Sequence, residues 1–288
     1  MTVVISDDLV LASVQEFDAD NPIIGWQNLV TTGNITSLNP NTLGTVEDPN
    51  YPTINLANTS TDQRFQQLTA GEDIAIDISL NGTQNVDYVG IAGHNFGTLA
   101  RSLRVYGATT VDGSGDPVYS AITQEVIPGN DSPLLWRFAS AAYLAIRVIA
   151  QTTLSTPATD VAYAAVLYVG ELLVLERKIQ VAFTPITMGR KADVITNVSE
   201  RGRFLGRTVI GSWRETRAAI GFMSPDWYRE NMDPFVENSI TEPFFFAWAP
   251  VSWPLEVGYV WTMDIPMPEI QDPTGILRIV LDLQGIAS

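Results

Sequence analysis

The chain has 288 residues, of which 45% are hydrophobic and 17% charged, so it holds enough apolar side chains for one large folded domain or two of ordinary size. It contains no cysteine, which excludes disulfides, thiol nucleophiles and Cys-ligated metals or clusters. The formal net charge of −16 argues against general binding to the phosphate backbone of nucleic acids.

The N-terminal region shows no targeting pattern. It has no basic residue before Asp7 and Asp8, so neither a secretory signal nor a lipidation site is expected. The longest apolar stretch, residues 161–175, is interrupted by Gly170 and Glu171 and is too short for a membrane span. We therefore expect a soluble protein, made in a cytoplasm and without membrane insertion.

Short apolar or alternating segments, separated by turn-forming residues, run through the whole chain and are typical of an all-β sandwich or barrel. Ile74, Ile76 and Ile78 alternate with Ala75 and Asp77, as in a strand with one buried face. In the first half, strands are expected at residues 73–80, 88–92, 102–106, 134–138, 142–150 and 162–175. In the second half they are expected at 179–183, 193–198, 207–219, 244–248, 258–263 and 275–283.

One segment carries helix signals instead. Ser224-Pro225-Asp226 provides an N-cap, a proline at the first helical position and an acid in the first turn. A short helix is therefore expected to begin there. Asp233 and Pro234 are expected to end it or to start a further turn through residue 239.

The charge distribution divides the chain near residue 177. Up to Glu176 there are 5 basic and 19 acidic residues, whereas residues 177–288 hold 11 basic and 13 acidic ones. We expect a leading segment at 1–22 that runs as a strand along a neighbour, a first β domain at 23–176 and a second at 177–288.

His94 and Asn95 lie in a glycine-flanked turn after an apolar strand. A single histidine cannot build a His-based zinc site, and a Ser–His–Asp triad stays formally open although the sequence has no Gly-x-Ser-x-Gly elbow. The favoured interpretation is a structural turn contact to the backbone. The alternative is a contact to a ligand or to a neighbouring subunit.

Asp112, Ser114 and Asp116 resemble the opening of a calcium loop. Pro117 and Thr123, however, stand where such a loop needs a glycine and a bidentate glutamate, so an exposed hairpin loop is favoured. No pair of acids is singled out for glycoside hydrolysis, and there is no phosphate-binding loop. We therefore predict no metal, no cofactor and no enzymatic activity.

Two features favour contacts with other proteins. Nine of the sixteen basic residues fall between residues 177 and 217, which indicates either an acidic partner or a solvated strand face with local ion pairs. Residues 244–261 hold seven aromatic side chains, which suit a core, a protein–protein interface or a platform for sugar. The predicted assembly interface consists of Arg177, Lys178, Arg190, Lys191, Arg201, Arg203, Arg207, Phe245, Trp248 and Trp253.

Several strand sequences of the first half resemble a known fold. They are Asp73-Ile-Ala-Ile-Asp-Ile, Asn85-Val-Asp-Tyr-Val-Gly-Ile-Ala-Gly-His-Asn, Ser102-Leu-Arg-Val-Tyr-Gly and Ala142-Tyr-Leu-Ala-Ile-Arg-Val. Together they resemble the galactose-binding-like (discoidin or F5/8 type C) jelly roll over about 23–175. The resemblance implies an N-terminal jelly-roll β-sandwich, followed by a small C-terminal β-barrel or β-sandwich with one short helix. It covers strand patterns, so no sugar- or calcium-binding residue is transferred.

The combination of this module with Phe244-Phe-Phe-Ala-Trp-Ala-Pro and Ile276-Leu-Arg-Ile-Val-Leu-Asp-Leu-Gln-Gly-Ile is similar to tail-tip, baseplate or minor tail proteins of long-tailed bacteriophages. This resemblance implies a non-enzymatic virion component, assembled in the host bacterial cytoplasm as a homo-oligomeric ring, a trimer or hexamer, that contacts other tail proteins. The alternatives are a carbohydrate-binding module that attaches to a host cell-surface glycan, and a capsid decoration or connector protein.

Overall fold

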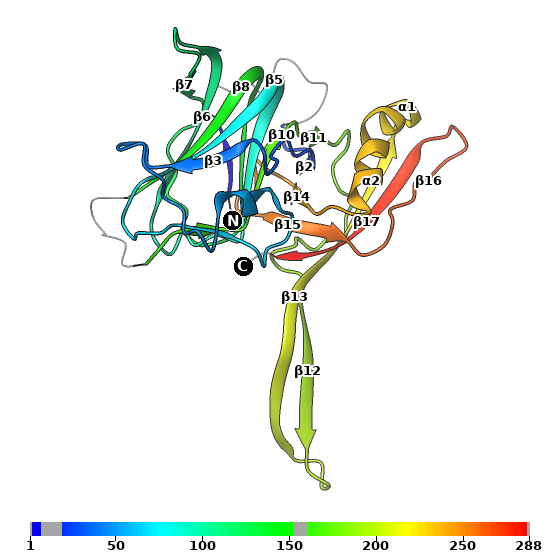
Figure 1. The fold of residues 1–288 in the computed structure, drawn as a ribbon. Coiled ribbons are helices and arrows are strands. Elements are labelled where there is room, and N and C mark those ends of the chain that lie inside the picture. The colour runs from blue at the N-terminus through cyan, green and yellow to red at the C-terminus, as the bar shows by residue number, and fades with distance from the viewer. Residues whose placement is uncertain (1, 7–18, 153–159, 287–288) are drawn as a thin grey trace.

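The computed structural model describes residues 2–6, 19–152 and 160–286. Two β-sheets form the body, and a two-stranded arm projects far beyond it (Figure 1). Most strand pairs are antiparallel, with β1 on β8 as a parallel pair. The predicted all-β class is confirmed. No helix in the described residues is long and apolar enough to cross a membrane.

The first sheet has seven strands, ordered β10-β5-β8-β6-β7, with β1 paired to β8 and β3 paired to β5. Its strands are β1 (Thr2–Ile5), β3 (Ile35–Leu38), β5 (Ile74–Ala92), β6 (Ser102–Val111), β7 (Pro117–Ala121), β8 (Leu134–Gln151) and β10 (Val166–Gly170). A separate short pair joins β4 (Phe65–Gln66) to β9 (Tyr163–Ala164), and a 3₁₀ helix, η1, spans Thr53–Ala57.

Strands β5 and β8 are each one long strand where the sequence predicted two. Their ladder is interrupted by two register shifts, one between Ser79 and Gln84 and one between Val86 and Tyr88. On one side of this irregular stretch the two strands pair with β3 and β6, and on the other side with β10 and β1. Side chains from both halves meet in one buried core, which makes the first sheet a sandwich.

The second sheet has eight strands, ordered β11-β2-β14-β15-β17-β13-β12, with β16 paired to β17. Its strands are β2 (Ile23–Gly25), β11 (Leu173–Val174), β12 (Arg190–Val198), β13 (Phe204–Met223), β14 (Phe244–Ala247), β15 (Val257–Thr262), β16 (Glu269–Ile270) and β17 (Leu277–Ile286). The strand predicted at 179–183 is wrong, because only Ile179 makes a bridge there, to Ile220.

The predicted helix is confirmed at residues 225–239. The Ser224 hydroxyl accepts a hydrogen bond from the Trp227 backbone N–H at 3.3 Å, and proline occupies the first turn. Three segments follow one another directly: α1 (Pro225–Trp227), the π-helix η2 (Tyr228–Met232) and α2 (Asp233–Ser239). Pro234 starts the last of them at a new first turn, where its missing N–H does no harm.

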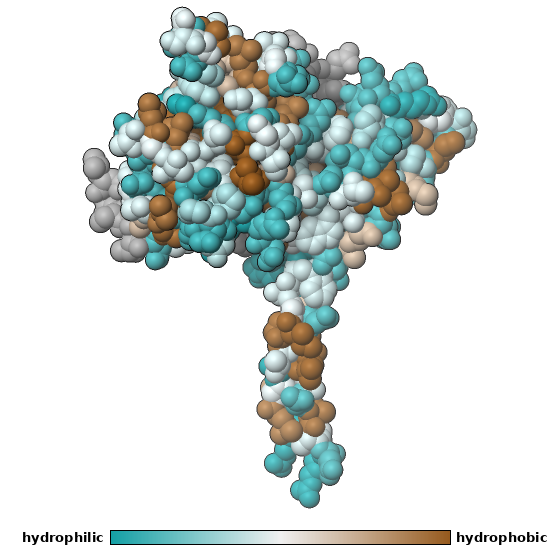
Figure 2. Space-filling view, in the orientation of Figure 1, coloured by the Kyte–Doolittle hydropathy of each residue, from teal (hydrophilic) through white to brown (hydrophobic). Residues whose placement is uncertain are grey.

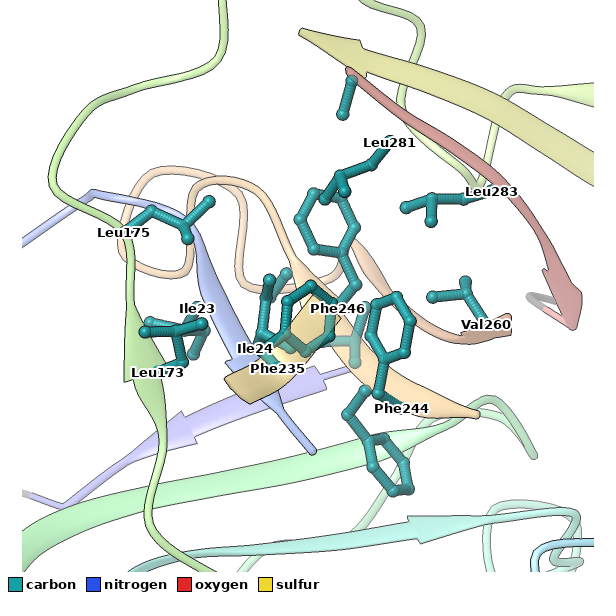
Figure 3. Close-up of a cluster of buried hydrophobic side chains, with 14 of the residues drawn as sticks. Ile23, Ile24, Leu173, Leu175, Phe235, Phe244, Phe246, Val260, Leu281 and Leu283 are labelled. Carbon is teal, nitrogen blue, oxygen red and sulfur yellow. The ribbon is translucent and has the colours of Figure 1, made fainter. Parts of the chain in front are cut away.

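A second core packs around the second sheet. Figure 3 shows side chains that gather there from the second sheet, the end of β11 and α2: Ile23, Ile24, Leu173, Leu175, Phe235, Phe244, Phe246, Val260, Leu281 and Leu283. The outer face of the first sheet joins this core through Tyr88, Val166 and Tyr168. The Tyr168 and Phe245 rings meet edge to face with centroids 5.5 Å apart.

The predicted domain boundaries differ from the observed pairing. Strands β2 and β11, which the sequence assigned to the first domain at 23–176, hydrogen-bond into the second sheet. In the leading segment at 1–22, β1 pairs with β8 of its own chain rather than with a neighbour. Residues 7–18 of that segment lie outside the described residues.

Candidate interaction surface

The arm consists of residues 190–214, which form β12 and the first half of β13. Strand β13 pairs with β17 only from Arg214 to Met223, so from residue 204 to 213 its described ladder partner is β12 alone. The arm therefore leaves the sheet as a two-stranded ribbon (Figure 1). Strand β12 has nine residues, which at about 3.3 Å each gives a ribbon about 30 Å long.

The hairpin closes through a five-residue tip. The Ser199 N–H donates to the Arg203 carbonyl and the Gly202 N–H to the Ser199 carbonyl, both at 2.8 Å. Gly202 has φ +73°, the left-handed conformation that glycine adopts without a steric cost. Local sequence thus fixes the turn, and β-branched residues such as Val194, Ile195 and Val209 favour the strands.

Large apolar side chains of the arm face solvent. Their exposed fractions reach 67% at Phe204 and Leu205 and 68% at Ile210. The exposed apolar set consists of Ile195, Val198, Phe204, Leu205, Val209 and Ile210. Figure 2 shows them as two brown bands along the arm, separated by polar atoms and ending in a hydrophilic tip. No side chain of the arm belongs to either of the two cores in the described structure.

The arm is basic although the protein is acidic. Residues 190–214 contain six Arg or Lys and two Asp or Glu, a net charge of +4. The rest of the chain, with ten basic and thirty acidic residues, has a net charge of −20. Within the described residues, Lys191 pairs with Glu215 at 3.5 Å, and no ion pair is recorded for Arg201, Arg203 or Arg207. The arm thus combines apolar bands with positive charge.

The structure brings together five residues of the predicted interface. Arg190, Lys191, Arg201, Arg203 and Arg207 all lie on the arm and are exposed. Arg177 and Lys178 are exposed in the segment that follows β11, and the Arg177 guanidinium donates to the Phe222 carbonyl at 3.2 Å. The apolar bands of the arm were missed by the sequence analysis. The sequence feature that could have revealed them is the presence of apolar residues on both faces of the hairpin, as in the adjacent pairs Phe204-Leu205 and Val209-Ile210.

The aromatic part of the predicted interface does not lie on the arm. Phe245 is fully buried between the two sheets, so its assignment to a contact surface for another chain is wrong. Its ring fills the space above Gly90, a position where a Cβ atom would come within 2.6 Å of it. Trp248 is half-buried and stacks on Trp253, which is 54% exposed, with ring centroids 6.5 Å apart.

His94 and Asn95 are both buried, and their side chains contact the backbone of neighbouring loops. His94 Nε2 lies 2.8 Å from the Ser132 carbonyl, and the Asn95 amide donates to the Val161 carbonyl at 2.9 Å. Burial lowers the pKa of His94 to about 4, so the ring is neutral at pH 7. Both side chains hold loops together.

In the loop at 112–116, backbone N–H groups of the loop itself hydrogen-bond to the Asp112 carboxylate. Asp112 Oδ1 accepts hydrogen bonds from the backbone N–H groups of Ser114 at 2.8 Å and Asp116 at 3.0 Å, which lower the pKa of this carboxyl. Across the parts of the chain that the structure describes, no three His, Asp or Glu side chains are grouped so that they could hold a metal ion.

A cavity of about 720 Å³ lies at the foot of the arm. Gly93, Asp131 and Pro133 line it from loops of the first sheet, while Lys191 and Trp213 line it from the arm. The Trp213 indole N–H donates to Glu215 of the same strand at 2.5 Å, at the point where β13 begins to pair with β17. The arm is therefore joined to the sheet at its foot, and beyond it β12 and β13 pair only with each other.

Comparisons with known proteins give structural likenesses only. No protein-family model matches the chain, and a search of curated proteins finds no match. Similar solved structures include chitosan-binding module 1 of a chitosanase/glucanase from Paenibacillus sp. IK-5, with 14% identity and a TM-score of 0.40 over 50% of this chain and 99% of the module. Another is the module CpGH89CBM32-5 from Clostridium perfringens, with 14% identity and a TM-score of 0.38 over 50% of this chain and all of the module.

A third likeness is to a pectin-binding carbohydrate-binding module, with 13% identity and a TM-score of 0.35 over 50% of this chain and 91% of that one. These solved structures are thus carbohydrate-binding modules. Identities and TM-scores as low as these carry no inference about what the present chain binds.

Proposed function

We propose that this protein is a non-enzymatic assembly component that docks its arm on another subunit of a larger particle. The observation that carries the proposal is the exposed apolar surface of the arm. A two-stranded ribbon is marginally stable by itself in water, and contiguous exposed apolar patches in soluble proteins are typical of binding surfaces. Covering both apolar bands with a partner removes this surface from water and holds the ribbon in place.

The setting for such a component is the tail tip or baseplate of a long-tailed bacteriophage. The resemblance of residues 244–250 and 276–286 to tail proteins supports this setting, together with an arm built for contact between subunits. The protein then belongs to the virion and is assembled in the host bacterial cytoplasm. A capsid decoration or connector protein would use the same arm in the same way.

An armless variant tests the proposal. Ala192 and Ser212 are directly paired across the arm, so residues 193–211 can be replaced by Asn-Gly, a two-residue loop that closes a hairpin. Sedimentation velocity is measured for the full chain and the armless chain, each alone and mixed with purified tail proteins of the same phage. The full chain should form complexes and the armless chain should not. Equal complex formation by both chains would contradict the proposal.

A second candidate function is glycan binding by the first domain, the activity in the titles of the similar carbohydrate-binding modules. One surface cluster favours it: the Arg64 guanidinium lies 4.4 Å from the Tyr163 ring centroid and 5.4 Å from that of Tyr51. Aromatic faces beside hydrogen-bond donors are the groups that hold sugars in binding pockets.

A glycan array with the wild-type protein tests this second candidate. Binding should be lost in Tyr51→Ala and in Arg64→Ala. It should persist in Tyr119→Ala, which removes a ring stacked on Arg147 elsewhere in the first sheet. An array without any wild-type signal would eliminate glycan binding and would leave the assembly role untouched.

A further inference from the structure

A groove of about 460 Å³ lies between the first sheet and the helical segment. It is lined by the carboxylates of Asp87, Glu171 and Glu230 and by the apolar side chains of Trp26, Leu172 and Pro234. We call it the acidic groove. No Lys or Arg lines it among the described residues, and the one cation that acts on Asp87 is the buried guanidinium of Arg137.

One carboxylate of the acidic groove is held in place. The Leu172 backbone N–H donates to Asp87 Oδ1 at 2.7 Å, which fixes that side chain in the groove wall. Burial raises the pKa of Asp87 to about 7, and the neighbouring Glu171 adds to the increase. A cation that enters the groove would therefore favour the charged form of Asp87 and relieve the repulsion between the two carboxylates.

The tip of the arm has the complementary chemistry. Arg201 and Arg203 stand at the turn, are exposed, and are followed at once by the exposed Phe204 and Leu205. A groove with acids and apolar walls fits a tip with guanidinium groups and apolar side chains. Guanidinium groups are also the cations best suited to carboxylates, since they form paired hydrogen bonds.

The arm cannot reach the acidic groove of its own chain. Figure 1 shows the arm leaving one side of the body, whereas β2, β11 and the helical segment that border the groove lie on the other side. A ribbon of paired strands about 30 Å long does not fold back on itself. The groove of another molecule is therefore the one that the tip can enter.

We propose that the arm tip of one copy docks in the acidic groove of a second copy, so that identical chains join head to tail. This inference rests on the proposed assembly function and names its partner. The net charges of +4 on the arm and −20 on the rest of the chain favour this contact over contact between two arms. Because the two contacting surfaces differ, repetition of the contact builds a ring if it closes and a filament if it does not.

Charge reversal tests the contact in the full chain. The tip variant is Arg201→Glu with Arg203→Glu, and the groove variant is Glu171→Lys with Glu230→Lys. Sedimentation velocity over a concentration series gives the self-association of each protein. The wild type should self-associate, and each variant should do so at least about tenfold more weakly, because like charges then face each other. Mixing the two variants should restore association, since the unchanged tip of the groove variant meets the unchanged groove of the tip variant, and the two reversed surfaces also match.

Two matched controls accompany these variants. Arg217→Glu changes an exposed arginine of β13 within the body, and Glu237→Lys changes an exposed acid of α2 outside the groove lining. Both should associate like the wild type. All proteins are compared by circular dichroism and thermal unfolding, so that a loss of association is not mistaken for a loss of folding.

The results separate this inference from the proposed function. A wild type that stays monomeric, but forms arm-dependent complexes with other tail proteins, would overturn the second-copy inference and leave the assembly role standing. If the tip variant weakens self-association and the groove variant does not, the arm docks elsewhere on the second copy, and the assignment of the acidic groove as its docking site is overturned. Restored association in the mixture supports both surfaces at once.

Discussion

Single residues decide how closely the two sheets approach. Gly90 of β5 lies against the Phe245 ring, and Gly25 of β2 lies against the Tyr88 ring, each at a distance that leaves no room for a Cβ atom. The Tyr88 hydroxyl donates a hydrogen bond to the Gln27 carbonyl at the same junction. These two contacts are where a glycine permits aromatic packing between the sheets.

The first prediction concerns this close approach. Gly90→Ala should lower the free energy of unfolding by about 1–3 kcal/mol, because the added methyl group would overlap the Phe245 ring. In a Phe245→Ala background the same change should cost much less, since the ring is gone. Gly113→Ala, at an exposed position with nothing within 4 Å of the new atom, is the control and should be nearly neutral. Urea denaturation of the wild type, the three single variants and the double variant measures these differences.

The second prediction concerns two buried groups with opposite responses to pH. The pKa of Asp87 is raised from 3.8 to about 7, so between these values the folded state keeps a proton that the unfolded state has lost, and stability falls as pH rises. The pKa of His94 is lowered from 6.5 to about 4, so between these values the unfolded state holds the extra proton, and stability rises with pH. From about pH 4 to 6.5 the two effects oppose each other.

Two variants separate these effects. Asp87→Asn should remove the loss of stability that Asp87 causes as pH rises. The free energy of unfolding of this variant, relative to that of the wild type, should therefore increase with pH, by at most about 1.4 kcal/mol per pH unit. His94→Gln should remove the gain of stability that His94 causes as pH rises, so its free energy of unfolding relative to the wild type should decrease with pH. Chemical denaturation at pH 4, 5, 6 and 7 gives the difference curves. Parallel curves for wild type and Asp87→Asn would show that Asp87 titrates normally.

At the scale of elements, the arm is the part of the molecule that packing does not support. Since none of its side chains joins a core, the body should not depend on it. The armless variant should therefore unfold within about 1 kcal/mol of the full chain, as expected for changes away from buried contacts. Urea denaturation of the two proteins, carried out side by side, measures the difference in their free energies of unfolding. A much larger loss would mean that the arm braces the body through its foot.

A further prediction concerns the exposed arginines of the arm. Trypsin should cut the free protein first after Arg201, Arg203 and Arg207, because an unsupported ribbon opens locally at low cost. Mass spectrometry of early fragments identifies the cleavage sites. Addition of a partner that covers the arm should slow these cuts selectively. First cleavage within the body would contradict a loosely held arm.

Sequence patterns located most strands but did not predict how the strands are joined, paired and covered. Alternation found both halves of β5 and of β8, but the irregular stretch that joins the halves, with its two register shifts, has no apolar period of its own, so each strand was predicted as two. The basic cluster was found because charge is visible in sequence. Its placement on an arm was not, because that depends on β17 ending its pairing at Arg214. Phe245 was misplaced because alternation gives a face and does not tell which layer covers it.

At the scale of the whole molecule, the two sheets share one interior. Strands β2 and β11, from the sequence of the first half, complete the second sheet, and the outer face of the first sheet packs on Phe245. Separation of the two halves would expose Tyr88, Tyr168 and Phe245 to water and break the pairing of β2 with β14. This shared interior holds the foot of the arm and the acidic groove at fixed positions on one body, as repeated head-to-tail contacts require.

A shared interior predicts a single cooperative unfolding transition for the protein at concentrations where it does not self-associate. Differential scanning calorimetry should show one peak, because neither sheet keeps its buried surface without the other. Phe245→Ala, between the sheets, and Phe138→Ala, inside the sandwich, should each cost about 3–5 kcal/mol and move that one peak to lower temperature. Two peaks in the wild type, or a split caused by Phe138→Ala alone, would mean that the sheets fold as separate units. The arm would then be fixed to only one of them.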